Sequence, residues 1–154
     1  MSQTVIQIEL SGKEGLVKKL NQIDSNMRGP AAKAMVSAGG SFIQGQARVN
    51  IHETFSEKQT GGMSNSITVE SKQIGQGAEA TISVNKIYAR IQEKGGTIRP
   101  RKAKMLHFWI DGREVFAHQV TLPPRPYLEP AIKNHNQEIV QAMSDVAETY
   151  LRKA

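Results

Sequence analysis

The residues best suited to chemistry in this sequence are two histidines and a glutamate on a predicted β-hairpin. Asp111-Gly112 predicts the turn of this hairpin, because a type I′ turn requires positive φ at both central residues. The resulting register places His107, Glu114 and His118 on one face, a composition that could bind a metal. However, Glu114 and His118 would be roughly 13 Å apart along one strand, whereas the ligands of one metal lie about 2 Å from it. We therefore expect no metal site.

The same register predicts which other side chains the hairpin presents. Ile110 pairs with Arg113 next to the turn, and Met105 pairs with His118 at the far end. We interpret the shared face as a cover for a neighbouring element or a neighbouring subunit, because its side chains are large and amphipathic. This face carries Met105, His107, Trp109, Glu114, Phe116 and His118.

Other catalytic and cofactor chemistry lacks the residues that it needs. The chain has no cysteine and no G-x-S-x-G nucleophile motif, and its 14 acids are scattered along the sequence. The segment GGTIRPRK lacks the spacing of a phosphate-binding loop and precedes a predicted strand, while GQG at 75–77 joins two predicted strands as a turn. We expect no enzymatic activity, no catalytic residue and no cofactor.

The most unusual segment of the chain is EKGGTIRPRKAK, residues 93–104. Its four cations, Arg99, Arg101, Lys102 and Lys104, supply four of the net positive charges in a chain with 20 cations, 14 acids and a net charge of +6. Three interpretations are open: a solvated loop, a nucleic-acid clamp assisted by flanking aromatic side chains, or an arm that docks on another protein. No signature of a nucleic-acid-binding module accompanies the segment, so we favour the docking arm.

The chain begins with a predicted strand. Residues 4–10 alternate between polar and apolar, with Ile6, Ile8 and Leu10 on one face, which is typical of a half-buried strand. This start lacks the cationic and long apolar segments of a secretory signal, and no apolar run approaches the roughly 20 residues that span a bilayer. From 38% hydrophobic residues, 22% charged residues and no cysteine, we expect a single intracellular globular domain, 1–154.

Two helices are predicted next. An apolar stripe at helical spacing predicts the first over residues 12–27, after a capping pattern at Ser11, and Gly29-Pro30 is predicted to end it. Pro30 suits the first turn of a second helix, which is predicted to continue to about Phe55. Three glycines in this second helix predict close contact with a sheet or another helix: Gly39, Gly40 and Gly45.

The second half of the chain predicts strands and a final helix. Segments 66–74 and 78–85 predict an antiparallel pair of strands, and a short helix over 87–93 precedes the basic segment. The segment PPRPYLEP is predicted to be extended, and residues 130–152 to form one long helix. The predicted fold class is α+β: a mainly antiparallel sheet with a β-hairpin, packed by two N-terminal helices and a long C-terminal helix.

Three segments in order carry a resemblance to a known family: TGGMSNSI at 60–67, YARIQEKGGTIRPRKAKML at 88–106 and VFAHQVTLPPRPYLEPAI at 115–132. They resemble the patterns TG-x-L-x-x-S, YA-x-x-QE-x-GG-x-I-x-P-K and P-A-R-P-[FY]-L-x-P-A of bacteriophage tail-completion and head–tail joining proteins. These are also called minor tail components or virion morphogenesis proteins. The chain departs from the patterns at Met63, Lys94 and Pro124.

The resemblance implies a structural virion protein that is not an enzyme. It would complete or terminate the tail and join it to the head as a subunit of an oligomeric ring, sixfold in this family. The implied partners are further copies of the chain and the head-connector and tail-tube proteins, with non-specific contact to DNA that passes through the ring and with no membrane. The implied location is the head–tail junction of the virion, and the host cytoplasm before assembly.

A ring subunit needs two different surfaces that close by rotation, and an extended arm can reach the next subunit. We expect Gly95-Gly96 to give such an arm backbone freedom, and its cations to meet an acidic patch on the neighbour. Tyr127 and Leu128 would anchor the proline-rich segment, either on the chain's own core or on a partner. The predicted interface residues are Tyr88, Glu93, Gly95, Gly96, Arg99, Arg101, Lys102, Lys104, Arg125, Tyr127 and Leu128.

The alternative function is that of a small basic nucleic-acid-binding protein that uses the loop 99–104. Phosphate contacts from lysine and arginine make such binding strongly dependent on salt concentration. The salt dependence of DNA affinity therefore separates this alternative from protein assembly.

Overall fold

Helix α2 (Ser25–Thr54) is the longest element of the structure, and the rest of the body packs on it. The computed structural model describes residues 12–55, 62–86 and 88–153. The predicted strand over residues 4–10 and the capping residue Ser11 lie outside the described residues.

The boundary between α1 (Lys13–Gln22) and α2 lies earlier than predicted. Asp24 separates the two helices: its Oδ1 accepts a hydrogen bond from the Asn26 backbone N–H at 2.9 Å and so caps α2. Because this cap fixes the start of the helix, Pro30 lies in the second turn, where it removes a backbone hydrogen bond without ending the helix. The prediction that Gly29-Pro30 ends the first helix was wrong, whereas the predicted end near Phe55 is confirmed.

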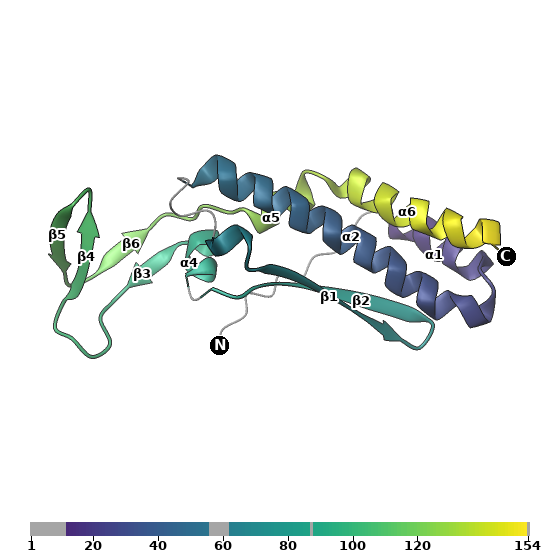
Figure 1. The fold of residues 1–154 in the computed structure, drawn as a ribbon, viewed down its shortest axis with the longest axis horizontal. Helices are drawn as coiled ribbons and strands as arrows, with labels where there is room; N and C mark the ends of the chain where they lie inside the picture. Colours follow the sequence, from purple (N-terminus) through teal and green to yellow (C-terminus); the bar gives the residue numbers. More distant parts are fainter. Residues whose placement is uncertain (1–11, 56–61, 87, 154) are drawn as a thin grey trace.

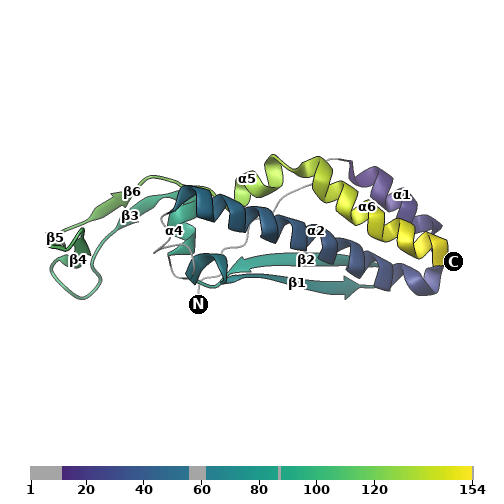
Figure 2. The ribbon, with the colours of Figure 1, turned by 45° about the horizontal axis from the view of Figure 1, so that its top comes forward.

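In the body of the molecule, α2 lies between a β-hairpin and a second helical layer (Figures 1 and 2). The hairpin consists of β1 (Ile67–Ile74) and β2 (Gly77–Val84). The helical layer consists of α1, α5 (Leu128–Lys133) and α6 (Asn136–Lys153). The main core between these elements contains Ile43, Ala47, Ile51, Phe55, Met63, Ile67, Val84, Ala89, Tyr127, Leu128, Ala131, Ile132 and Ile139.

Two of the three glycines that predicted close contacts along α2 make them. A Cβ atom built on Gly40 would lie 2.6 Å from Cγ1 of Val69 on β1, and one on Gly39 would lie 3.0 Å from Sδ of Met143 on α6. These glycines therefore let the hairpin and α6 approach α2 closely. At Gly45 an added Cβ would have no neighbour within 4 Å among the described residues, so the predicted contact is not found there.

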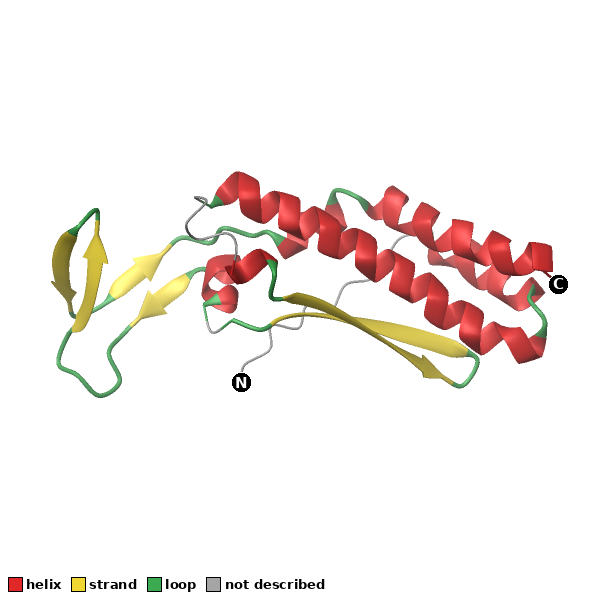
Figure 3. Ribbon diagram, in the orientation of Figure 1, coloured by secondary structure: helices red, strands yellow, loops and turns green. Residues whose placement is uncertain are grey.

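The strands of the described residues form three separate antiparallel pairs (Figure 3). β1 and β2 pair across their full length, as predicted, from Ile67 with Val84 to Ile74 with Gly77. The predicted hairpin is also confirmed as β4 (Leu106–Ile110) and β5 (Arg113–Ala117), and positive φ angles of 49° at Asp111 and 76° at Gly112 give its predicted turn. The predicted pair Met105–His118 lies beyond both strands, because the register ends at Leu106 and Ala117.

The third strand pair was not predicted. β3 (Gly96–Ile98) pairs with β6 (Val120–Leu122), with Gly96 opposite Leu122 and Ile98 opposite Val120. The short helix predicted before the basic segment is confirmed as α4 (Ala89–Lys94). An α+β fold with antiparallel strands and a long helix at each end of the chain is thus confirmed.

The C-terminal helix differs from the prediction in its start and continuity. The predicted extended segment ends at Tyr127, and α5 already begins at Leu128. α5 is separated from α6 at Asn134 and His135, so the predicted single helix over 130–152 consists of two helices. Within the described ranges, no helix is both long and apolar enough to cross a bilayer.

Candidate functional site: a projecting arm

Residues 95–126 form an arm that leaves the body at the end opposite to the C-terminus (Figures 1 and 2). β3 and β6 form its stalk, the basic loop 99–104 follows the stalk, and the hairpin β4–β5 forms its tip. No residue of the arm belongs to either hydrophobic core cluster of the described chain. The arm is therefore held by its base, not by packing along its length.

The carboxylate of Glu93 holds the two sides of the arm base together. It accepts hydrogen bonds from the backbone N–H groups of Tyr127 at 2.8 Å, Leu128 at 3.1 Å and Glu129 at 2.9 Å. These groups belong to the first turn of α5, whose N–H groups have no partner within the helix. Glu93 is buried, so this side chain from α4 serves as the cap of α5.

Gly95 brings the returning chain against the end of α4. Its φ is 69°, and an added Cβ atom would lie 2.7 Å from the backbone nitrogen of Pro124 and 2.9 Å from the backbone oxygen of Leu122. Nearby, the Arg125 N–H donates to the backbone oxygen of Gln92 at 2.7 Å. The expectation that Gly95-Gly96 gives the arm freedom is therefore wrong for Gly95, which makes a close backbone contact.

Tyr127 and Leu128 are anchors of the chain's own core. Both side chains are buried, and the backbone oxygen of Tyr127 accepts a hydrogen bond from Nδ2 of Asn50 at 2.8 Å. The Tyr127 hydroxyl is buried without a hydrogen-bond partner among the described residues. Burial, and then the charge of Glu93, raise the pKa of Tyr127, so the phenol stays neutral. The sequence left open whether these two residues anchor on the chain's own core or on a partner, and the structure places both on the chain's own core.

The four predicted cations of the arm are exposed. Arg99 donates from Nε to Oε1 of Gln119 at 3.2 Å, and none of Arg99, Arg101, Lys102 and Lys104 forms an ion pair with a described residue. Arg101 also lines an open hollow at the arm base of about 1020 Å³, together with Tyr88, Lys86, Arg90 and Lys94. Among these, Lys94 pairs with Glu129 at 3.5 Å.

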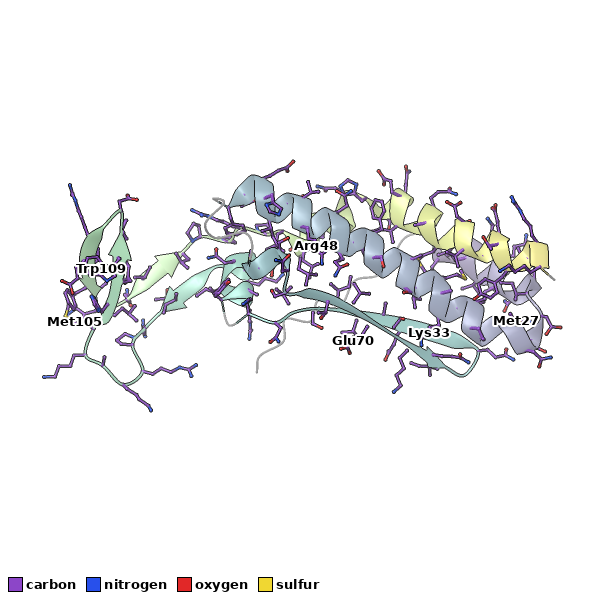
Figure 4. All side chains as sticks on the ribbon, viewed as in Figure 1. Met27, Lys33, Arg48, Glu70, Met105 and Trp109 are labelled. Atoms are coloured by element: carbon purple, nitrogen blue, oxygen red, sulfur yellow. The ribbon has the colours of Figure 1, made fainter. Side chains whose placement is uncertain are left out.

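The tip of the arm carries the largest exposed apolar side chains of the described residues, on a hairpin that the sequence predicted to cover a neighbouring element or subunit. Trp109 and Met105 lie at the far end of the arm (Figure 4), and Ile110 and Phe116 are also exposed. His107 stacks on Phe116 with ring centroids 4.8 Å apart. The sequence indicates this exposed apolar tip, because neither face of the hairpin is mainly polar. The face opposite to the aromatic side chains carries Leu106, Phe108, Ile110 and Val115.

The predicted histidine face is organised by pairwise contacts. Nε2 of His107 lies 2.7 Å from Oε1 of Glu114 on the opposite strand, while His118 lies outside both strands. The described ranges 12–55, 62–86 and 88–153 contain no group of three or more histidine, cysteine, aspartate and glutamate side chains that could hold a metal.

The predicted interface residues thus fall into two groups. Glu93, Gly95, Tyr127 and Leu128 build the arm base, whereas the remaining residues lie on accessible surface: Tyr88, Gly96, Arg99, Arg101, Lys102, Lys104 and Arg125. Comparison of the chain with protein families, with curated proteins and with solved structures finds no match.

Proposed function

We propose that this chain is a structural subunit of a phage particle, without enzymatic activity. It would act at the head–tail junction, where it completes or terminates the tail and joins it to the head as part of a homo-oligomeric ring. The order of the three family-like segments supports this proposal. The structure adds a physical link between two of them, because Glu93 of the second segment caps the helix that starts in the third.

The observation that carries the proposal is the exposed apolar tip. Trp109 is 64% exposed and Phe116 is 56% exposed on one face, and Ile110 is 51% exposed on the other. An isolated two-stranded hairpin is marginally stable in water, and apolar residues on both faces are typical of strands that are covered on both sides. The tip therefore suits insertion into a partner surface, as a ring subunit requires.

The arm base suits the same role. Because Glu93 and Gly95 fix the two strands of the stalk to the body, the direction of the arm is set before a partner binds. Such preorganisation lowers the entropy lost on association. The exposed cations of the basic loop would then steer the arm towards an acidic surface on the neighbouring subunit.

Electron microscopy of a lysate from the producing phage or prophage, with this gene interrupted, tests the proposal. We expect filled heads next to detached or overlong tails, and the type of tail defect identifies the side of the junction that the protein serves. Normal infectious particles would contradict the proposal.

Variants of the tip connect that result to the arm. The double variant Trp109→Ser, Phe116→Ser should fail to restore joined particles when it is supplied to the interrupted phage. Ile74→Ser is the matched control, because Ile74 is an exposed apolar residue at the end of the other hairpin. Equal restoration by both variants would show that the tip has no part in assembly.

The second candidate function is nucleic-acid binding, and the exposed cations of the loop 99–104, which have no ion-pair partner among the described residues, favour it. Changing Arg99, Arg101, Lys102 and Lys104 together to Ser tests both candidates in one protein. A steep fall of DNA affinity with salt in the wild type, abolished in this variant, would favour nucleic-acid binding. Loss of assembly with the fold intact and no change in DNA affinity would favour the docking arm.

A further inference from the structure

Strand β4 at the tip of the arm has an unprotected edge. β5 pairs with β4 along one edge, and no backbone hydrogen bond joins the other edge to a described residue. Free edges in natural proteins usually carry charged side chains or proline, which discourage pairing with a further strand. β4 has the sequence LHFWI and contains no lysine, arginine, acid, proline or glycine, whereas β5 begins with Arg113 and Glu114. The edge of β4 is therefore the one suited to the addition of a strand.

The turn of the hairpin determines which backbone groups this edge offers. Ile110 and Arg113 flank the two-residue turn and form a hydrogen-bonded pair, so alternate residues counted back from Ile110 direct their N–H and C=O groups to β5. His107 and Trp109 lie between these residues and direct their backbone groups away from β5. The free edge thus presents two N–H and two C=O groups to a partner.

We propose that β4 of a second copy of the chain pairs with this edge, antiparallel and about a two-fold axis at Phe108. In this register His107 of one copy lies opposite Trp109 of the other, so the outward backbone groups of the two strands meet. Leu106 of one copy lies opposite Ile110 of the other. Every cross-strand pair then joins aromatic or aliphatic side chains, and such pairs stabilise a sheet. Two hairpins thereby form one four-stranded sheet.

Charge complementarity favours this antiparallel arrangement. The register places Lys104, which precedes β4, next to the turn that contains Asp111 of the second copy. Two-fold symmetry repeats the contact, so the basic loop of each copy meets an acid of the other. A parallel pair of β4 strands, or β4 paired with β5 of the next copy, would instead bring both basic loops to the same end of the sheet. Like charges would then repel each other.

The pairing covers the most exposed aromatic side chain of the tip. Trp109 lies at the far end of the arm (Figure 4) and is 64% exposed. In the four-stranded sheet it lies beside His107 of the second copy, which stacks on Phe116 of its own hairpin. A two-fold contact closes on itself, so it links two chains only and would have to open before the tip reached the partner surface proposed above. The inference itself does not depend on that proposed function.

Disulfide formation between copies tests the inference in the full-length chain, which has no cysteine of its own. Phe108→Cys places a cysteine at the two-fold axis, opposite the same position of the second copy. Val115→Cys is the matched control, because Val115 pairs with Phe108 within the hairpin and is also half-buried, but lies on β5. At equal low concentration, we expect Phe108→Cys to form disulfide-linked dimers about tenfold faster than Val115→Cys, because bridging requires close Cβ atoms.

Two other results of this experiment overturn the inference. Equal rates for the two variants would show that the β4 edges do not meet in the proposed register. A bridge between Phe108→Cys and Val115→Cys chains in a mixture, without a bridge between two Phe108→Cys chains, would show that β4 pairs with β5 of the next copy.

Sedimentation equilibrium without cross-linking tests the charge contact. We expect the wild type to dimerise, and Lys104→Ser to weaken dimerisation by about fivefold, because two exposed ion pairs are lost. Asp111→Asn keeps a residue type suited to the turn and should weaken dimerisation to a similar extent. The two changes together should have no further effect, because they remove the same contact. Additive losses would overturn the proposed register, and monomers at every concentration up to the solubility limit would overturn the pairing.

Discussion

Two β-hairpins in the described part of the chain are similar in build but lie in different surroundings. β1–β2 turns at Gly75-Gln76 and β4–β5 turns at Asp111-Gly112, and both are two-stranded and antiparallel. The first packs on α2 and buries Ile67 and Val84, whereas the second projects from the body and exposes Trp109. Local turn chemistry is thus sufficient to specify a hairpin, but the neighbouring elements determine whether its apolar side chains stabilise the isolated subunit.

The largest expected difference between the hairpins is in the effect of losing one apolar side chain. Ile67→Ala should lower the free energy of unfolding by about 3 kcal/mol, because it leaves a cavity in the main core. Trp109→Ala should change it by no more than about 0.5 kcal/mol, because the side chain is exposed. Urea unfolding of the isolated subunit measures both values, and similar losses would mean that the tip is covered by its own chain.

The next largest effect is expected at the arm base. Glu93→Ala should cost about 2 kcal/mol, because it leaves buried backbone N–H groups of α5 without an acceptor. Glu114→Ala on the tip is the control and should stay within about 0.5 kcal/mol, because that carboxylate is accessible to water. Unfolding monitored by circular dichroism compares the two variants, and equal stabilities would contradict the role of Glu93 as the cap of α5.

Two glycines of α2 test how closely the packed hairpin β1–β2 approaches this helix. Gly40→Ala should destabilise by about 1.5 kcal/mol, because its Cβ would meet Cγ1 of Val69 at 2.6 Å. Gly45→Ala should stabilise by about 0.5 kcal/mol, because alanine favours the helix and its Cβ has no neighbour within 4 Å among the described residues. Thermal melting should therefore shift in opposite directions, and shifts of the same sign would contradict the close approach of β1 to α2.

The smallest effect is expected at the surface contact between α1 and α6. Lys19 donates to Glu148 at 2.7 Å, and this hydrogen bond, with the charge of Lys19, lowers the pKa of Glu148 below its usual value of 4.5. A lowered pKa in the folded state means that the stabilisation is present above that usual value and is lost as the pH falls through the folded-state pKa.

Lys19→Met tests this contact. The difference in urea midpoint between the wild type and this variant should be small near neutral pH and should shrink in acid. A difference that grows as the pH falls would contradict the direction of the pKa change. Because the contact is exposed, its loss should leave the arm and both hairpins unaffected.

Much of the fold could be predicted from local signals. The turn at Asp111-Gly112, the strand segments of both hairpins and the apolar stripe of the first helix depend on residues that are close in sequence. The boundary between α1 and α2 was misplaced in the prediction. Pro30 is compatible with an early helical turn and does not mark the start of α2, which is set by the cap at Asp24. The pairing of β3 with β6 was missed because each strand has only 3 residues, too few for a periodic pattern.

The candidate site could be predicted only in part. The basic loop and the motif residues around Glu93 and Tyr127 were identified, but sequence gave no means of separating buried residues from exposed ones. A glutamate next to a lysine and two glycines is typical of a solvated surface. Glu93 is nevertheless buried, and its carboxylate accepts hydrogen bonds from backbone N–H groups at the start of α5. Conversely, the apolar residues of the tip suggest a core, and the structure leaves them exposed.

The sequence by itself determined the elements: the hairpins, the long helix and the cluster of cations at 99–104 follow from turn chemistry, apolar periodicity and charge. Only the tertiary structure decided that Glu93 and Gly95 join α4 to the start of α5, and that the second hairpin stands away from the core. The physical reason is that burial and capping depend on segments far apart in the chain. The Tyr127 N–H and the Glu93 carboxylate meet across 34 residues, a contact that no local pattern encodes.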